Sequence, residues 1–261
     1  MSTLPTAAEA AAARWLAEAA AVTVLSGAGI STDSGIPDFR GPQGVWTKDP
    51  SAQALSTIDA YLADPQVRRR AWQARLDNPV WRARPNSAHH ALVALERAGK
   101  LRAIVTQNID GLHQAAGSSA EKVIEIHGTA HWCTCLSCAR RTPMPEVLDR
   151  VRAGEPDPPC PDCGGIQKSA TISFGQSLRP EVLAAATAAS RECDLFLAVG
   201  TSLSVYPAAG LCDHAVAAGA RLAVVNAEPT PYDRVAGAVI QAPVGEVLTR
   251  LVAAAGARRA G

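Results

Sequence analysis

The chain has 261 residues, of which 48% are hydrophobic and 4% aromatic, and its 25 basic and 24 acidic side chains leave a net charge of +1. A chain of this length can bury a sizeable core in one large domain, or in a large and a small one. The balanced charge and the few aromatic rings argue against nucleic acid or an anionic membrane as a partner, and no apolar run approaches the length of a membrane span.

The first predicted element is a helix that begins after Thr6, a residue type that often caps helix N-termini. The N-terminal segment lacks a basic leader and carries Glu9 and Glu18, which is not the pattern of a secretory signal peptide. We therefore expect a cytoplasmic protein. In a reducing compartment, clustered cysteines are better explained by metal binding than by disulfides.

A short apolar strand over residues 22–25 runs into Gly27-Ala28-Gly29. A strand followed by Gly-x-Gly is typical of a dinucleotide-binding turn, although a glycine turn needed only for packing explains these residues equally well. The dehydrogenase fingerprint expects a third glycine where Thr32 stands, and an acid at a strand end about 20 residues on. That region, GPQGVWTKDP, does not resemble a strand end. The pattern favours a nucleotide site that is not that of a dehydrogenase.

The rest of the chain alternates predicted helices and strands. Residues 42–85 are helical in character with proline breaks, and an amphipathic helix is predicted over 87–98. Further short apolar strands are predicted at 101–106, 123–126, 170–174, 194–199, 221–225 and 238–240. Continuous apolar strands separated by helices are typical of a parallel sheet covered on both faces.

Five of the seven cysteines lie within residues 133–163. Two Cys-x-x-Cys pairs, separated by 21 residues, stand out among them: Cys135 with Cys138, and Cys160 with Cys163. Four thiolates make a closed tetrahedral site, which predicts one structural zinc ion and no metal chemistry. Cys133 is a competing ligand; Cys135 is preferred because it completes two matching pairs.

The predicted fold class is therefore α/β: a Rossmann-like parallel sheet with helices on both faces, a helical insertion and a small zinc-binding module. We predict that the large domain comprises residues 1–41, 86–131 and 169–261. The small domain would comprise a helical part, residues 42–85, and the zinc-binding module, residues 132–168.

Polar residues follow two of the predicted strands. Asn108 and Asp110 leave the strand at 101–106, where ligand groups commonly lie in an α/β sheet, although Asn-x-Asp is also an ordinary polar turn. His127 follows the strand at 123–126, and its ordinary pKa of about 6.5 suits a general base near neutral pH. The sequence thus offers candidates for a reaction at the carboxyl edge of the sheet.

In chain order the motifs form one series: Gly27-Ala28-Gly29-Ile30-Ser31, Gly35-Ile36-Pro37-Asp38-Phe39-Arg40, Thr106-Gln107-Asn108-Ile109-Asp110-Gly111-Leu112-His113, His127-Gly128, the two cysteine pairs, Phe174-Gly175, Gly200-Thr201-Ser202-Leu203 and Asn226. This series resembles that of the sirtuins, the NAD-dependent protein-lysine deacylases. The resemblance extends from about residue 15 to residue 252. Each motif alone is short, and their specificity comes from their common order.

The resemblance implies that NAD is a consumed co-substrate. The residues that it assigns to NAD binding are Gly27, Ala28, Gly29, Ile30, Asp38, Phe39, Arg40, Gln107, Asn108, Ile109, Asp110, Gly200, Thr201, Ser202, Asn226, Glu228 and Val244. Phe39 would lie in a loop over the nicotinamide end of NAD and would shield the reacting ribose from water. Asp110 would hold the nicotinamide carboxamide. With Asn108 orienting the ribose or a water, His127 would activate a ribose hydroxyl. The products would be nicotinamide, O-acyl-ADP-ribose and free lysine.

The resemblance also places the acylated-lysine protein substrate. The segment Ile172, Ser173, Phe174 and Gly175 would pair with an extended peptide by strand addition, although Gln176 replaces the family's usual acid. Trp72-x-x-Arg75 is the nearest match to a Tyr-x-x-Arg motif of some bacterial sirtuins that remove succinyl or malonyl groups. Arg75 lies in a basic run, VRRRAWQAR, in which a solvent-exposed position is the common outcome. Acetyl is therefore the default acyl group.

Two other functions are compatible with the same motifs. One is a different NAD-consuming reaction, either mono-ADP-ribosyl transfer or NAD hydrolysis. The other is a noncatalytic module that binds NAD, zinc and a partner. His127 and the peptide-binding edge near Ile172 favour deacylation over the first alternative, and the presence of Asn108, Asp110 and His127 together argues against the second.

Overall fold

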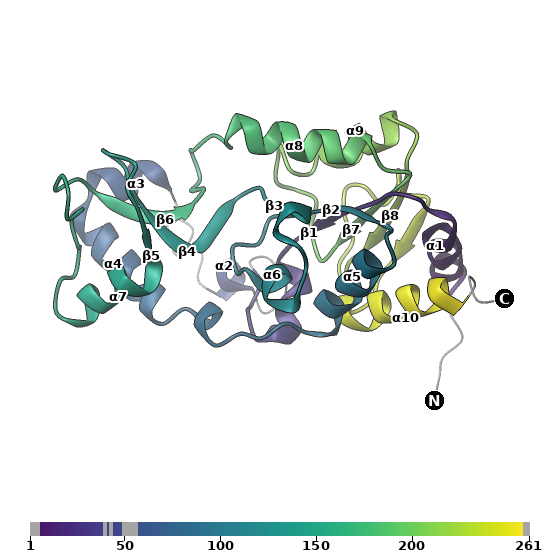
Figure 1. The fold of residues 1–261 in the computed structure, drawn as a ribbon, viewed down its shortest axis with the longest axis horizontal. Coiled ribbons are helices and arrows are strands. Elements are labelled where there is room, and N and C mark those ends of the chain that lie inside the picture. The colour runs from purple at the N-terminus through teal and green to yellow at the C-terminus, as the bar shows by residue number, and fades with distance from the viewer. Residues whose placement is uncertain (1–5, 39–40, 42–43, 49–56, 258–261) are drawn as a thin grey trace.

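The computed structural model of the chain describes residues 6–38, 41, 44–48 and 57–257. Its centre is a parallel six-stranded sheet in the order β3-β2-β1-β7-β8-β9 (Figure 1). The strands are β1 (Val22–Ser26), β2 (Leu101–Thr106), β3 (Val123–Glu125), β7 (Leu195–Val199), β8 (Arg221–Val225) and β9 (Ala238–Ile240). Each lies where an apolar run predicts a strand, and the predicted α/β fold is confirmed.

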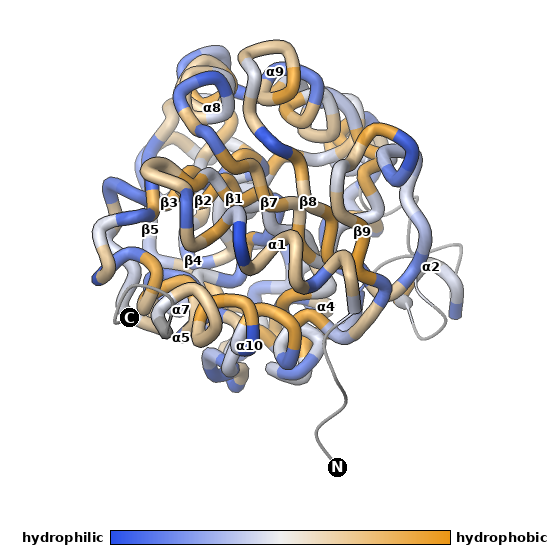
Figure 2. The backbone as a smooth tube through the Cα atoms, turned by 90° about the vertical axis from the view of Figure 1, so that its right-hand side faces the viewer, coloured by the Kyte–Doolittle hydropathy of each residue, from blue (hydrophilic) through white to orange (hydrophobic). Residues whose placement is uncertain are grey.

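Helices cover both faces of this sheet, as Figure 2 shows. The helices α1 (Ala7–Glu18), α5 (Ser87–Arg97) and α10 (Val244–Ala257) pack on one face, and α8 (Pro180–Arg191) and α9 (Leu211–Ala217) pack on the other. All five residues of β1 and of β7 are buried, which explains why β7 is apolar throughout and β1 is mostly apolar. No helix within the described residues is long and apolar enough to cross a membrane.

Local signals fix where several elements begin and end. The predicted cap at Thr6 is confirmed: its hydroxyl accepts from the Glu9 amide (3.2 Å), while the Glu9 carboxylate accepts from the Thr6 amide (2.9 Å). The shorter elements are α2 (Val45–Lys48), α6 (Leu112–Ala116), η1 (Ala28–Ile30), η2 (Thr32–Ser34), η4 (Pro79–Trp81) and η5 (Ala120–Lys122). Several of these short turns follow the carboxyl ends of strands, where they position the candidate site.

A second, antiparallel sheet lies at one end of the molecule (Figure 1). Its strands run in the order β5-β4-β6, with bounds β4 (Gly128–Cys135), β5 (Arg141–Pro143) and β6 (Gln167–Thr171). Three helices accompany this sheet: α3 (Ile58–Ala63), α4 (Pro65–Leu76) and α7 (Met144–Arg152). Trp72, Cys133, Met144 and Leu148 form a small core there, separate from the cores on the two faces of the large sheet.

One predicted strand of the large sheet is wrong. Residues 170–174 were expected to join that sheet, but Ala170 and Thr171 end β6, and Gly128 in β4 pairs with Thr171. Phe174 pairs with Thr57 in an isolated parallel bridge outside both sheets. A short apolar run does not distinguish a strand of the large sheet from a strand of the small one, because both are buried on at least one face.

Candidate active site

Two glycine turns meet where the strand order of the large sheet reverses, between β1 and β7. The Gly27 amide donates to the Val199 carbonyl (3.1 Å), and the Gly29 amide donates to the Gly200 carbonyl (2.8 Å). A Cβ atom at Gly27 would lie 2.7 Å from the Gly200 oxygen, and one at Gly29 would lie 2.8 Å from the Gly200 Cα. The glycines therefore permit close backbone packing at the switch point, where α/β sheets bind ligands.

A polar cluster forms at the ends of β1 and β2. The Asn108 side chain donates from Nδ2 to the Gly27 carbonyl and to Ser31 Oγ, both at 3.1 Å. Ser31 Oγ in turn donates to Asp110 Oδ2 (2.7 Å), while the Leu112 amide donates to Asp110 Oδ1 (3.0 Å). Asp110 is only 6% exposed, so these donors hold a buried carboxyl group in one orientation. The predicted residues Asn108 and Asp110 are thus joined to the first glycine motif.

Gln107 connects His127 to the Gly200-Thr201-Ser202-Leu203 motif. The Gln107 carbonyl is 3.1 Å from His127 Nδ1, and Gln107 Nε2 donates to Thr201 Oγ1 (2.9 Å). Because a carbonyl can only accept, Nδ1 of His127 carries the hydrogen and Nε2 keeps its lone pair. Burial lowers the pKa of His127, and the bond to Gln107 offsets this only in part. At neutral pH, His127 is therefore a neutral imidazole that can accept a proton at Nε2.

The structure adds two residues that the sequence did not single out as site residues. Ser31 bridges Asn108 and Asp110, and its place inside the glycine motif was a usable signal. His131 lies in β4, and its Nε2 is 2.8 Å from the Asp110 carbonyl, so it donates there. Its ring lies edge-on to Trp81, with centroids 5.7 Å apart. No local pattern around His131 predicts this contact.

The late segments lie around the ends of β7 and β8. The Asn226 side chain donates to the Glu228 carbonyl (2.7 Å), and Ser202 Oγ lies 2.7 Å from Ser204 Oγ. Ile30 and Val244 are core residues, with 1% and 6% exposure. Their side chains belong to the core on one face of the large sheet, so their backbone atoms are the parts available to a ligand.

The loop that follows η2 is described in part. The Asp38 carbonyl accepts from the Val45 amide (2.9 Å). The predicted residues Phe39 and Arg40 lie outside the described residues. Ala28 begins η1, and the Ile109 carbonyl accepts from the Ala130 amide (2.9 Å), which ties the turn after β2 to the start of β4.

The segment predicted to pair with a peptide lies beside His127. The Ile172 amide donates to the His127 carbonyl (2.8 Å), and the Phe174 carbonyl accepts from the Ile58 amide (2.9 Å). The Ser173 amide donates to the Gln176 side chain (2.9 Å). Gly175 has a φ of 86°, which favours glycine, and ends the extended stretch. The segment is therefore anchored on both sides, next to the candidate base.

The expectation of a solvent-exposed Arg75 is wrong. Arg75 is half-buried, and its guanidinium lies 4.9 Å from the Trp72 ring centroid and 5.5 Å from that of Tyr61. Its Nη1 is fully shielded and has no hydrogen-bond partner among the described residues. Trp72 is itself completely buried in the core of the smaller sheet. Packing of the aromatic rings on the arginine withdraws it from solvent, an arrangement that a basic run does not reveal.

Four cysteine sulfurs converge at the end of β4. The sulfurs of Cys135, Cys138, Cys160 and Cys163 all lie within 4.8 Å of one another. The Sγ–Sγ distances are 3.5 Å for Cys135 and Cys163, and 3.7 Å for Cys138 and Cys160. Zinc–sulfur bonds of about 2.3 Å place tetrahedral sulfurs about 3.8 Å apart, so the cluster fits this ion. Cys133 lies outside the cluster, and its thiol contacts Gln167 Oε1 at 3.7 Å.

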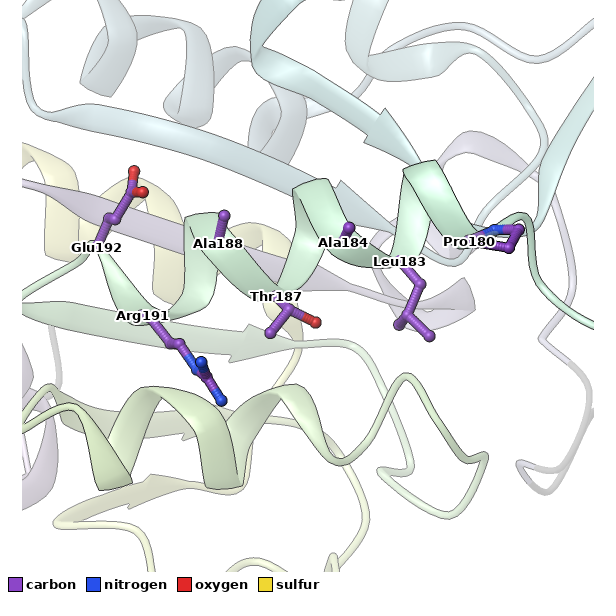
Figure 3. Close-up of a pocket in the computed structure, with 7 residues that line it drawn as sticks. All are labelled: Pro180, Leu183, Ala184, Thr187, Ala188, Arg191 and Glu192. Atoms are coloured by element: carbon purple, nitrogen blue, oxygen red, sulfur yellow. The ribbon is translucent and has the colours of Figure 1, made fainter.

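A surface hollow of about 580 Å³ lies along α8 (Figure 3). The residues that line it are Pro180, Leu183, Ala184, Thr187, Ala188, Arg191 and Glu192. None of them belongs to the predicted site. The hollow is therefore separate from the cluster at the strand ends.

A sequence model of the Sir2 family matches residues 27–207, which span every part of this cluster except the late segments after β8. The chain belongs to the Sir2 family. This confirms the resemblance to the sirtuins. A similar protein is NAD-dependent protein deacetylase 2 of Streptomyces coelicolor, 57% identical over 88% of this chain and 96% of that protein. NAD-dependent protein deacetylase 1 of Bradyrhizobium diazoefficiens is 44% identical over 89% and 91% of the two chains.

Solved Sir2 structures share the fold over nearly the whole chain. One from work on the mechanism and regulation of Sir2 enzymes is 38% identical, with a TM-score of 0.87 over 97% of this chain and 98% of the other. A Sir2 complex with a p53 peptide and NAD+ is 35% identical, with a TM-score of 0.83 over 94% and 97%. The fold of this chain is thus that of the solved Sir2 structures.

Proposed function

We propose that this chain is an NAD-dependent protein-lysine deacylase, with acetyl-lysine as the default substrate. The observation that carries the proposal is the meeting of three motifs: the Asn108–Ser31–Asp110 cluster is joined through Gln107 to His127, whose Nε2 is free to accept a proton. Relatives that are 57% and 44% identical are NAD-dependent protein deacetylases, which supports the same activity here. Nicotinamide, O-acyl-ADP-ribose and deacylated lysine would be the products.

The residues around the strand ends would share the work of binding and chemistry. When bound, NAD supplies a ribose carbon whose bond to nicotinamide is exchanged for a bond to the acyl oxygen. His127 Nε2 would remove a proton from a ribose hydroxyl, and its lowered pKa keeps it neutral and ready to do so. The Asp110 carboxyl group, fixed by Ser31 and Leu112, would accept from the nicotinamide carboxamide. Asn108 would orient the ribose.

The remaining nucleotide contacts are proposed from the same geometry. Gly27, Gly29 and Gly200 bring two backbone turns together at the switch point, where amides and a short helical turn can meet a pyrophosphate. Asn226 and Glu228, at the end of β8, would bind the adenosine side. Loop residues 38–40 would cover the nicotinamide side.

One zinc ion would hold the smaller sheet together. Its ligands would be Cys135, Cys138, Cys160 and Cys163, whose spacing fits a closed tetrahedral site. Such a site leaves no open position for a reacting water. Zinc would therefore stabilise the fold and take no part in deacylation.

The domain boundaries proposed for the large and small parts, together with a cytoplasmic location, rest on the sequence pattern.

Acylated-lysine proteins are the proposed partners. Residues Ile172–Gly175 lie next to His127 and would present the peptide backbone. An acidic acyl group is a second candidate substrate, because Arg75 has a shielded Nη1 without an acceptor among the described residues. A succinyl or malonyl carboxylate would satisfy that nitrogen. No charge pattern supports nucleic acid as a partner.

The test follows nicotinamide release from NAD with acetyl-, succinyl- and long-chain acyl-lysine peptides. We expect release that depends on peptide in the wild type and in His214→Gln, and loss of release in His127→Ala. Preference for succinyl peptide that disappears in Arg75→Met would identify the acidic substrate. Release without any peptide would contradict deacylation in favour of NAD hydrolysis. Labelling of protein by ADP-ribose would instead indicate ADP-ribosyl transfer. Absence of nicotinamide release in every mixture would indicate a noncatalytic module that binds NAD, zinc and a partner.

A further inference from the structure

A chain of hydrogen bonds runs behind Asn108, through residues that the proposed chemistry does not use. His113 Nε2 lies 2.9 Å from Ser26 Oγ, and Ser26 Oγ donates to Thr106 Oγ1 (2.9 Å). The Asn108 amide also donates to Thr106 Oγ1, at 3.1 Å. His113, Ser26 and Thr106 are 1%, 0% and 2% exposed, so water cannot replace these bonds. The series starts on α6, crosses the ends of β1 and β2, and finishes on the Asn108 backbone.

The hydrogens in this chain can be assigned. Ser26 has one hydroxyl hydrogen, and it is given to Thr106, so Nε2 of His113 must donate to Ser26 Oγ. Thr106 Oγ1 then accepts two hydrogens, one on each lone pair. Burial lowers the pKa of His113 to about 3, so the imidazole is neutral throughout the pH range of an assay. The direction of the bonds is therefore the same from mildly acidic to alkaline pH.

The His113 ring is itself fixed from the side of α5. Its centroid lies 5.0 Å from that of His89, and the two rings meet at 62°. His89 Nδ1 lies 3.0 Å from the side-chain oxygen of Asn86, the N-cap of α5. Asn86 Nδ2 donates to the Ile30 carbonyl (2.8 Å), in the turn that carries Ser31. Both sides of the Asn108 cluster are thus held by buried polar contacts.

We propose that His113 is a positioning residue for Asn108, acting through Ser26 and Thr106. The hydroxyl of Thr106 holds the Asn108 amide where the backbone leaves β2, and Ser26 holds the Thr106 rotamer. His113 completes the series because it donates to the Ser26 oxygen. Without this donor, the Ser26 side chain would change rotamer to reach another partner. The inference rests on the proposed function in one respect, namely that Asn108 acts on NAD.

Matched variants separate the hydrogen bonds from the packing. His113→Phe keeps a ring without a donor, whereas His113→Gln keeps an amide donor near the position of Nε2. Thr106→Val removes the hydroxyl at nearly constant shape, and Thr106→Ser retains it. We expect His113→Phe and Thr106→Val each to lower kcat and raise KM for NAD. The resulting fall in kcat/KM for NAD should be about three- to tenfold, the scale of one hydrogen bond. KM for the acyl peptide should stay constant, and the Gln and Ser variants should remain within about twofold of the wild type.

The two links act in series. The double variant His113→Phe with Thr106→Val should therefore be no less active than the more impaired of the two single variants. A second readout does not depend on activity: hydrogen exchange of the Asn108 amide should be faster in the Phe and Val variants and unchanged in Gln, Ser and the control His214→Gln. A lowered Tm with unchanged kinetics and exchange would overturn the proposal, as would multiplicative losses in the double variant. If Asn108→Ala leaves activity intact, the proposed role of Asn108 fails, while amide exchange still decides whether His113 positions it.

Discussion

Two buried histidines, His89 and His113, whose rings pack edge-on, should make the fold lose stability in mild acid. Burial lowers the pKa of His89 to about 4 and that of His113 to about 3, and the neighbouring His89 ring adds to the cost of protonating His113. The unfolded chain, with an ordinary histidine pKa of about 6.5, therefore binds protons more readily than the folded chain. The stabilising contribution is full above about pH 6.5 and is lost as the pH falls from there toward the folded-state values.

The magnitude follows from the linkage relation. Each histidine loses about 1.4 kcal/mol of stability for each pH unit below its unfolded value, so at about pH 5 each contributes a loss of about 2 kcal/mol and the pair about 4 kcal/mol. This loss is a large part of a typical free energy of unfolding of about 5–15 kcal/mol. Acid should thus weaken the fold well before most carboxylates titrate.

Urea unfolding at pH 7 and at pH 5 measures this effect. The variants are His89→Gln, His113→Gln and their combination, with His214→Gln as the control. We expect the wild type and the control to lose about 4 kcal/mol more than the double variant between the two pH values. Zinc release in acid affects all variants alike, because the cysteines are unchanged. An equal loss in the wild type and the double variant would refute the reasoning that these two rings stay neutral in the fold.

Three further predictions concern the site and the smaller sheet. The acid limb of the kcat/KM profile should lie below about pH 6.5, because burial lowers the pKa of His127; a limb above that value would contradict its role as the base. Cys138→Ser should remove the one zinc ion per chain and lower Tm, whereas a zinc-free wild type in metal analysis would contradict the site. Gly29→Ala should destabilise the fold by about 1–3 kcal/mol in urea unfolding and raise KM for NAD, because its methyl would meet the Gly200 backbone at 2.8 Å; wild-type values of both would show that the two turns can separate.

The large sheet was predictable because burial on both faces leaves a direct mark on the sequence. Runs such as Leu195–Val199 and Arg221–Val225 are apolar almost throughout, as expected of strands in a parallel sheet that is covered on both faces. The segment at 170–174 carries the same mark but overlaps the end of the antiparallel strand β6. An apolar composition indicates that a segment is buried, but it does not indicate which of the two sheets the segment joins.

The site was predictable as a set of strand ends and not as a set of contacts. Parallel strands bring their carboxyl ends to one edge, so motifs after β1, β2 and β7 had to lie near one another. The bonds themselves depend on side chains far apart in sequence. Ser31 meets Asp110 across 79 positions, and His131 reaches the Asp110 carbonyl from the other sheet. Arg75 was misplaced for the same reason, since the rings that cover it come from tertiary packing.

The hydroxyl residues that end β1 and β2 show how this fold separates its core from its site. Ser26 and Thr106 lie directly opposite each other in the parallel register, at the ends of strands that are largely apolar and buried apart from Thr23 and the exposed Arg102. A buried hydroxyl left without a partner costs about 1–3 kcal/mol, so a valine would be the more stabilising choice at either position considered alone. The two hydroxyls are tolerated because they bond to each other, to His113 and to the Asn108 amide. At this edge of the sheet, hydrogen bonds replace part of the apolar packing. Because hydrogen bonds are directional, they can hold the Asn108 backbone, and with it the Asn108 side chain, in a single orientation toward a ligand.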